Sequence, residues 1–156
     1  MLTTLENTSL ALWVGESLWA YPSLLACHII GLAIVAGIFS MRDLKLLGLF
    51  PALDTTVFRH LLRLALLGFA INAVSGFLLF SSQASYLATS IPFLSKLVCI
   101  AVGMSTAIVL QSRLSIQLAS GLESTTVDRV TQLLAALSLS VWVGAIIAGR
   151  LIAYIF

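Results

Sequence analysis

The fold of this chain is decided by residues 16–48, which read ESLWAYPSLLACHIIGLAIVAGIFSMRDLKLLG. Residues 18–41 carry no formal charge. At about 1.5 Å per residue, a helix of that length crosses a hydrocarbon core of roughly 30 Å. The uncharged run ends at Arg42 and Asp43, which are followed by Lys45. The pattern therefore predicts a transmembrane helix over about residues 18–41.

The composition of the whole chain agrees with a membrane location. The 156 residues are 60% hydrophobic and 9% charged, far from the average of soluble domains. The net charge of +2 is small and there is no run of basic residues, so we expect no nucleic-acid partner. We expect an integral membrane protein with the lipid bilayer as its partner. Assembly into a homo-oligomer or a larger membrane complex is left open.

Three further apolar segments predict three more membrane helices. They cover about residues 61–80, 94–111 and 132–154. The predicted fold is all-α, a polytopic membrane protein built as a four-transmembrane-helix bundle. Residues 1–15 mix leucines with polar side chains and predict a short N-terminal helix in the membrane interface. Residues 1–156 are expected to form a single four-helix membrane domain.

The positions of the basic residues predict the orientation of the bundle. Six Lys and Arg residues lie in the first and third loops, and two lie on the opposite side. By the positive-inside rule the two basic loops are cytoplasmic and both termini are outside. The first 15 residues lack the basic start of a cleaved signal peptide, and we expect them to be retained.

Polar groups inside the spans mark a candidate site. His28 is the only strongly polar group of the first span, and an ionisable residue inside a membrane suggests a function by default. Counting residues along the spans places His28, Asn72 and Met104 within about one helical turn of the bilayer midplane. The same count places Lys96 and Arg150 roughly 10 to 12 Å nearer the outer face. We expect His28 and Arg150 to face the bundle interior.

The first of three hypotheses is a redox or electron-transfer module that binds haem b or a quinone in the outer half of the bundle. The cofactor would lie between the first, third and fourth spans. His28 is the candidate metal ligand and Met104 a second one, while Lys96 and Arg150 would pair with haem propionates. The candidate cofactor-binding residues are His28, Met104, Lys96, Arg150 and Asn72. The alternative is that His28 only makes a structural hydrogen bond, for example to Asn72.

The other two hypotheses are transport and assembly. A copper or small-solute transporter would use the soft ligands of Cys27, Cys99 and Met104 together with His28. Cys27 and His28 are adjacent and point about 100° apart on a helix, which weakens the copper hypothesis. In a non-catalytic subunit of a larger complex, the polar layer would only fix the helix register. Because the chain has no P-loop, GxSxG, HExxH or carboxylate pair in a span, we expect no stand-alone catalytic activity.

Short motifs are spread along nearly the whole chain. They are SxWxYP (17–22), HxxG (28–31), DLKLLG (43–48), GF (68–69), SG (75–76), LF (79–80), PFxxKL (92–97), Trp142 and GRLIAY (149–154). On these motifs the chain resembles a family of uncharacterised bacterial four-helix membrane proteins, catalogued as a domain of unknown function. The resemblance implies a multi-pass protein of the bacterial inner membrane and implies no activity. In such a membrane the outer side, where the positive-inside rule places both termini, is the periplasm. A looser similarity of layout links the chain to copper-resistance-D-type proteins and four-helix b-type cytochromes.

Overall fold

The computed structural model describes residues 2–50, 52–54, 56–119, 127–152 and 154. These residues form helices and no strands. The helices are α1 (Leu2–Glu6), α2 (Ser9–Glu16), α3 (Ala20–Leu46), α4 (Thr56–Ser81), α5 (Ala84–Leu87), α6 (Ile91–Ala119) and α7 (Arg129–Leu151). In length and composition α3, α4, α6 and α7 are long and apolar enough to cross a membrane. The predicted all-α, four-helix membrane bundle is therefore confirmed.

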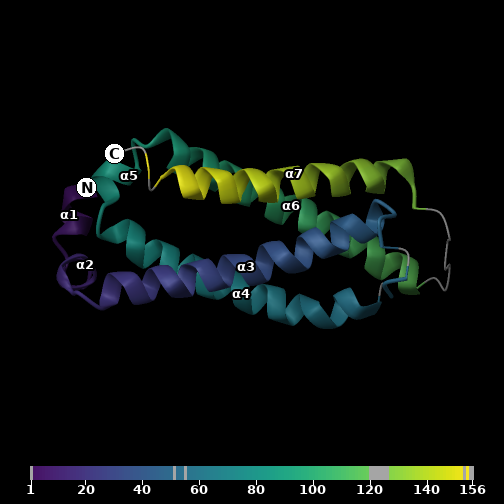
Figure 1. Cartoon of the computed structure of the whole chain (residues 1–156), viewed down its shortest axis with the longest axis horizontal. Helices are drawn as coiled ribbons and strands as arrows, with labels where there is room; N and C mark the ends of the chain where they lie inside the picture. The colour runs from purple at the N-terminus through teal and green to yellow at the C-terminus, as the bar shows by residue number, and fades with distance from the viewer. Residues whose placement is uncertain (1, 51, 55, 120–126, 153, 155–156) are drawn as a thin grey trace.

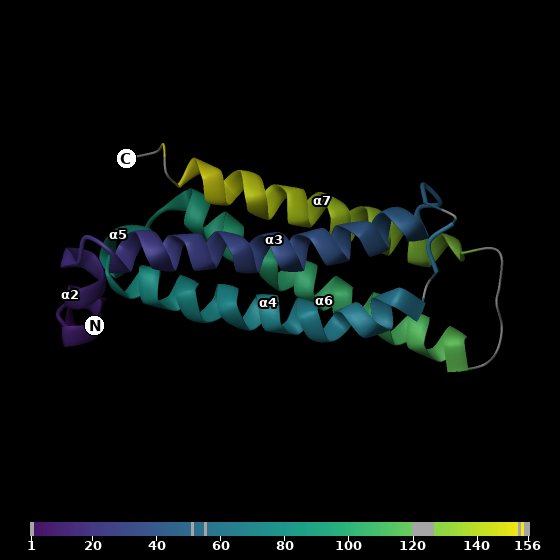
Figure 2. The same ribbon diagram turned by 60° about the horizontal axis from the view of Figure 1, so that its bottom comes forward.

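The four long helices run alternately up and down the bundle (Figure 1). Helix α3 packs along α4 and α7, and α6 packs along α7. Helices α1, α2 and α5 gather at one end, beside the end of α7, and we call this the capped end (Figure 2). At the opposite end, called the charged end, α3 and α6 finish and α4 and α7 begin.

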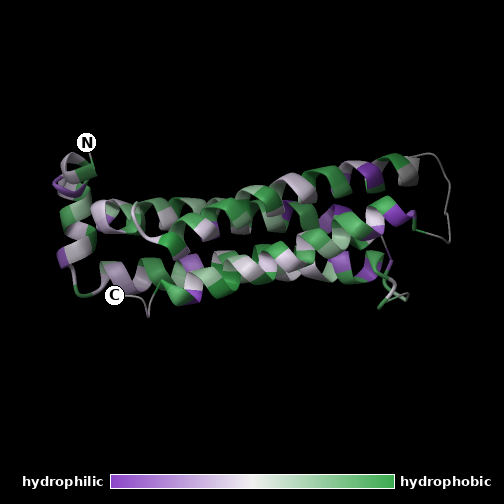
Figure 3. Ribbon diagram, turned by 90° about the horizontal axis from the view of Figure 1, so that it is seen from above, coloured by the Kyte–Doolittle hydropathy of each residue, from purple (hydrophilic) through white to green (hydrophobic). Residues whose placement is uncertain are grey.

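The surface of the bundle suits a hydrocarbon environment. Hydrophobic residues cover the length of the long helices, while strongly hydrophilic ones lie mostly toward the ends (Figure 3). Large apolar side chains are exposed on all four, for example Ile29 (57%), Phe77 (60%), Val98 (62%) and Leu133 (71%). Such an extensive apolar surface marks contact with lipid.

The membrane helices extend beyond the predicted spans at the charged end. Helix α3 continues to Leu46 instead of stopping near residue 41, and α4 begins at Thr56 instead of near residue 61. Before α4, the Asp54 carboxylate accepts hydrogen bonds from the Thr56 N–H (2.9 Å) and hydroxyl (2.7 Å). These bonds hold the pKa of the Asp54 carboxyl below its usual range and satisfy a backbone donor at the start of the helix.

The N-terminal segment forms two short helices where a single interfacial helix was predicted. The carboxylate of Glu6, the last residue of α1, accepts hydrogen bonds from the Ser85 N–H (2.7 Å) and hydroxyl (2.9 Å) on α5. On α2, Ala11 and Val14 are buried while Trp13 is 62% exposed. This arrangement closes the capped end over α3 and α4 and leaves an aromatic side chain at the surface.

An apolar cluster fills the middle of the bundle. It consists of Val35, Ala36, Phe39, Ala65, Ala107 and Trp142. The Phe39 and Trp142 rings lie 5.7 Å apart between their centroids. This apolar cluster separates the polar groups near the capped end from those near the charged end.

Candidate functional site

His28 lies on α3 near the capped end, where α4 fixes one of its ring nitrogens. Nδ1 is 2.9 Å from the backbone oxygen of Asn72 and 3.3 Å from the hydroxyl of Ser75. A carbonyl oxygen can only accept, so the proton of the neutral imidazole sits on Nδ1. The Ser75 hydroxyl donates to the Ile71 carbonyl at 2.6 Å, so it too is placed to accept from Nδ1. The lone pair of the ring is therefore on Nε2.

Lys96 on α6 meets that lone pair. Its Nζ is 2.9 Å from His28 Nε2, and since Nε2 carries no proton, the ammonium group donates. No other hydrogen-bond partner of Lys96 occurs among the described residues. The aliphatic stem passes beside α7, where a Cβ added to Gly149 would lie 3.5 Å from Lys96 Cδ. The Lys96 ammonium group therefore donates one N–H to the lone pair of His28 Nε2 and has further N–H donors.

Small residues let α3 and α4 approach closely enough to build this site. A Cβ added to Gly31 would lie 2.8 Å from both Asn72 N and Gly68 O. A Cβ at Gly76 would lie 2.9 Å from Cε1 of the His28 ring. The Asn72 side chain donates from Nδ2 to the His28 carbonyl at 2.8 Å. Asn72 therefore holds both the ring and the backbone of His28.

Three of the five predicted site residues come together, namely His28, Asn72 and Lys96. Met104 lies apart from them, packed against the apolar cluster in the middle of the bundle. Arg150 is exposed, donates to the Tyr154 hydroxyl at 3.0 Å and stacks on that ring at 5.1 Å. The expectation that Arg150 faces the bundle interior was wrong, because a tyrosine one turn further along offers a partner outside it.

His28 does not lie at the midpoint of its helix, where it was predicted to lie. Lys96 was expected roughly 10 Å nearer the outer face than His28, and its long side chain brings Nζ to Nε2. Because α3 continues to Leu46, its midpoint lies near Ala33 and not at His28. The histidine therefore sits closer to the capped end, within reach of the long Lys96 side chain.

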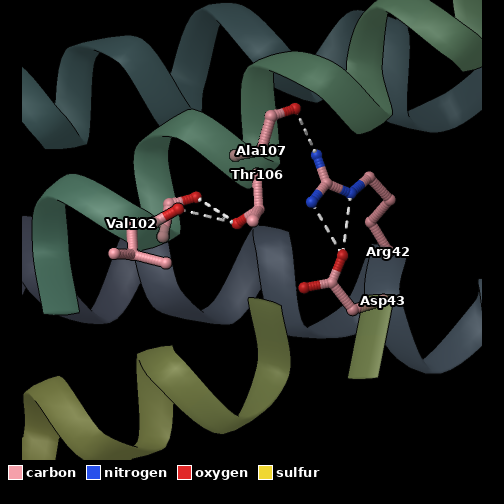
Figure 4. A network of polar contacts seen from close by, with 6 residues as sticks. Arg42, Asp43, Val102, Thr106 and Ala107 are labelled. Carbon is pink, nitrogen blue, oxygen red and sulfur yellow. Dashed lines mark hydrogen bonds and ion pairs between the residues drawn. The ribbon is translucent and has the colours of Figure 1, made fainter. Parts of the chain in front are cut away.

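A buried ion pair at the charged end was missed by the sequence analysis. Arg42 (1% exposed) and Asp43 (0%) were expected to end the first span, but both lie inside the bundle (Figure 4). Arg42 Nη2 and Nε donate to Asp43 Oδ1 at 2.7 and 3.0 Å, and Nη1 donates to the Ala107 carbonyl at 3.0 Å. The guanidinium also lies 5.0 Å from the centroid of the Phe39 ring. The pair joins α3 to α6 and tolerates burial because its two charges cancel.

The same region contains polar groups that stay within one helix or lack a partner. The Thr106 hydroxyl donates to the carbonyls of Val102 (3.0 Å) and Gly103 (2.9 Å) on its own helix (Figure 4). The second carboxylate oxygen of Asp43 and the hydroxyl of Ser138 are buried without a hydrogen-bond partner among the described residues. The described residues around Arg42 and Asp43 therefore link helices, and they hold no second imidazole–ammonium pair like that of His28 and Lys96.

The other candidate metal ligands do not gather around His28. The described residues hold no group of three or more His, Cys, Asp or Glu side chains suited to a metal ion. His60 is exposed at the start of α4, toward the charged end. Cys27 is exposed and lines a shallow hollow of about 360 Å³ between α3 and α4. Cys99 faces α7, where its Sγ lies 3.4 Å from a Cβ added to Gly144.

Comparisons of the chain with protein-family models, with curated proteins and with solved structures give no match. The family resemblance carried by the motifs therefore stays an expectation. Interpretation of the site rests on its own geometry, in which an oriented imidazole and an ammonium group meet inside a membrane bundle.

Proposed function

We propose that the chain is a redox module of the bacterial inner membrane that binds the head group of a quinone at His28 and Lys96. The observation that carries this proposal is the orientation of His28. Its Nδ1–H is engaged by the Asn72 carbonyl, so Nε2 and the Lys96 ammonium form one acceptor and one donor side by side. Polar groups inside a membrane are costly, and a pair held this firmly suggests that a ligand uses it.

The pair matches the oxygen atoms of both forms of a quinone. A quinone carbonyl oxygen accepts, and Lys96 has N–H donors beyond the one that His28 uses. A quinol hydroxyl donates, and Nε2 accepts once Lys96 moves aside. When bound, a quinone supplies two-electron, two-proton redox chemistry.

The protein's own part is to hold a proton at Nε2. After accepting a proton there, the ring keeps its Nδ1–H bond to Asn72, so its position is unchanged.

Haem fits the described arrangement less well. Iron would have to take the Nε2 lone pair, which the Lys96 ammonium occupies at 2.9 Å. Met104, expected as a second ligand, packs against the apolar cluster with Phe39 and Trp142. One feature does favour a metal, since ligating histidines commonly donate their other ring N–H to a carbonyl, as His28 does to Asn72.

The test is to purify the protein in mild detergent and to measure bound quinone, visible absorption and binding of added decylubiquinone and decylubiquinol. We expect wild-type protein to bind both forms. Lys96→Met should weaken binding of decylubiquinone about tenfold or more, because it removes a hydrogen bond from a charged donor. His28→Ala should weaken binding of decylubiquinol, because it removes the acceptor of the quinol hydroxyl. Cys27→Ala, next to His28 but exposed, is the matched control and should bind normally.

Two outcomes would contradict this proposal. A haem absorption band that disappears in His28→Ala would assign the site to haem. Absence of both quinone binding and haem, with His28→Ala behaving like the wild type, would leave His28 as a structural hydrogen bond between α3 and α4. A metal assay that finds copper would support the transport hypothesis.

A further inference from the structure

We propose that Phe80 and Phe93 form a gate between α4 and α6 through which the quinone ring enters from the bilayer. This inference rests on the proposed function. The two rings are stacked, with centroids 5.3 Å apart and planes 10° from parallel. Phe80 lies in the last turn of α4 and Phe93 in the first turn of α6, and both side chains are partly buried.

The stack lies directly beside the His28–Lys96 pair. Gly76, which touches the His28 ring, precedes Phe80 by four residues, and Lys96 follows Phe93 by three. Residues three or four apart share one face of a helix. The two rings therefore stand one turn closer to the capped end, on the faces of α4 and α6 that build the site.

Short helices cover the α3 and α4 side of the bundle at this end. Helices α1, α2 and α5 cover α3 and α4, with Val14 fully buried and Glu6 bonded to Ser85. Among the described residues, α4 and α6 make far less contact with each other than α3 makes with α4 or α6 with α7. A ligand with an apolar tail is dissolved in the bilayer and approaches from the side. The sparsely packed seam between α4 and α6 gives such a ligand a lateral route to Lys96 on α6.

The chemistry of the gate selects a planar ring. Two parallel phenyl rings offer flat faces, and aromatic rings prefer offset-stacked arrangements with one another. A benzoquinone or naphthoquinone ring can stack on either face as it passes, with its oxygen directed at the pair. An aliphatic lipid of similar size gains no such contact. The gate therefore adds selectivity for an aromatic or quinonoid head group to the hydrogen bonds of the site.

The test replaces each ring with a side chain that keeps the apolar volume but cannot stack. Phe80→Leu, Phe93→Leu and the double variant are compared with Phe77→Leu, a control whose side chain is 60% exposed on the same helix. Stopped-flow measurements give association and dissociation rates for decylubiquinone. We expect the two gate variants to associate and dissociate about two- to twelvefold more slowly, because the lost stacking contact stabilises the ring during its passage, while the Kd stays close to that of the wild type. Phe77→Leu should match the wild type.

The results separate this inference from the function on which it rests. If wild-type protein binds decylubiquinone and Lys96→Met does not, while Phe80→Leu and Phe93→Leu keep the rates of Phe77→Leu, the gate is refuted and the quinone site remains. If the wild type binds no quinone, both proposals fail together. Circular dichroism of each variant, which should show unchanged helix content, excludes unfolding as the cause of the changed rates.

Discussion

Asn72 is the residue that fixes the position of the His28 ring and the nitrogen that carries its proton. Its carbonyl accepts from Nδ1 and its amide donates to the His28 backbone, so one residue of α4 fixes both the ring and the helix that carries it. His28 and Asn72 were correctly predicted from the sequence to lie at one depth. Which ring nitrogen would be engaged could not be predicted, because that depends on the rotation of α3 against α4.

Gly31 sets how closely α3 and α4 approach, and Gly31→Ala should destabilise the bundle. The new Cβ would lie 2.8 Å from backbone atoms of Asn72 and Gly68, which cannot move aside as a side-chain tip would. Overpacking of this kind costs about 1–3 kcal/mol. Gly37→Ala is the control on the same helix, with nothing within 4 Å of the added Cβ.

The free energy of unfolding in mixed detergent micelles gives the comparison. Gly37→Ala should be neutral or stabilising by up to about 1 kcal/mol, since alanine is the better helix former. Equal effects of the two substitutions would show that α3 and α4 are not packed at Gly31 as described.

At the scale of elements, α3 shows where sequence reasoning works and where it stops. Apolar length predicted the helix, and the uncharged run placed its start well. The charges of Arg42 and Asp43 were interpreted as the end of the span, because a single charge in a membrane is expensive. Both residues instead lie within the helix, because the Arg42 guanidinium pairs with the adjacent Asp43 carboxylate and donates a hydrogen bond to the Ala107 carbonyl. Whether such a pair is buried depends on α6, which is distant in sequence.

Breaking this ion pair should cost more than removing it. Arg42→Met leaves the Asp43 carboxylate buried without its partner, and loss of one member of a buried pair costs about 3–5 kcal/mol. The double variant Arg42→Met/Asp43→Leu removes both charges and should recover a large part of that stability. Unfolding free energies measure the difference, with Arg63→Ala, an exposed residue of α4, as the control. A double variant that is no more stable than Arg42→Met would show that the Arg42–Asp43 ion pair is not buried within the bundle.

At the scale of the whole molecule, charge distribution and helix order agree. Helix α1 and the end of α7 lie at the capped end, and Arg59 and Arg63 begin α4 at the charged end (Figure 1). Four helices that alternate in direction require both termini on one side, which the sequence also predicted. Which side that is follows only from the positive-inside rule.

We expect the capped end to face the periplasm. Green fluorescent protein fused after Phe156 should be dark, because it does not mature after export, and alkaline phosphatase fused at the same position should be active. The same reporters fused in the loop between α3 and α4 should give the reverse pattern. A fluorescent C-terminal fusion without phosphatase activity would contradict the orientation.

The central claim, that His28 presents Nε2 as an acceptor to a bound quinol, is tested most directly by ¹⁵N NMR of its ring. The chain has two histidines, so His60→Gln leaves His28 as the single labelled ring. The account predicts a protonated Nδ1 and a lone-pair-bearing Nε2 in the free protein. Adding decylubiquinol should shift the Nε2 resonance and leave Nδ1 protonated. A proton on Nε2, or a spectrum that saturating quinol does not change, would contradict it.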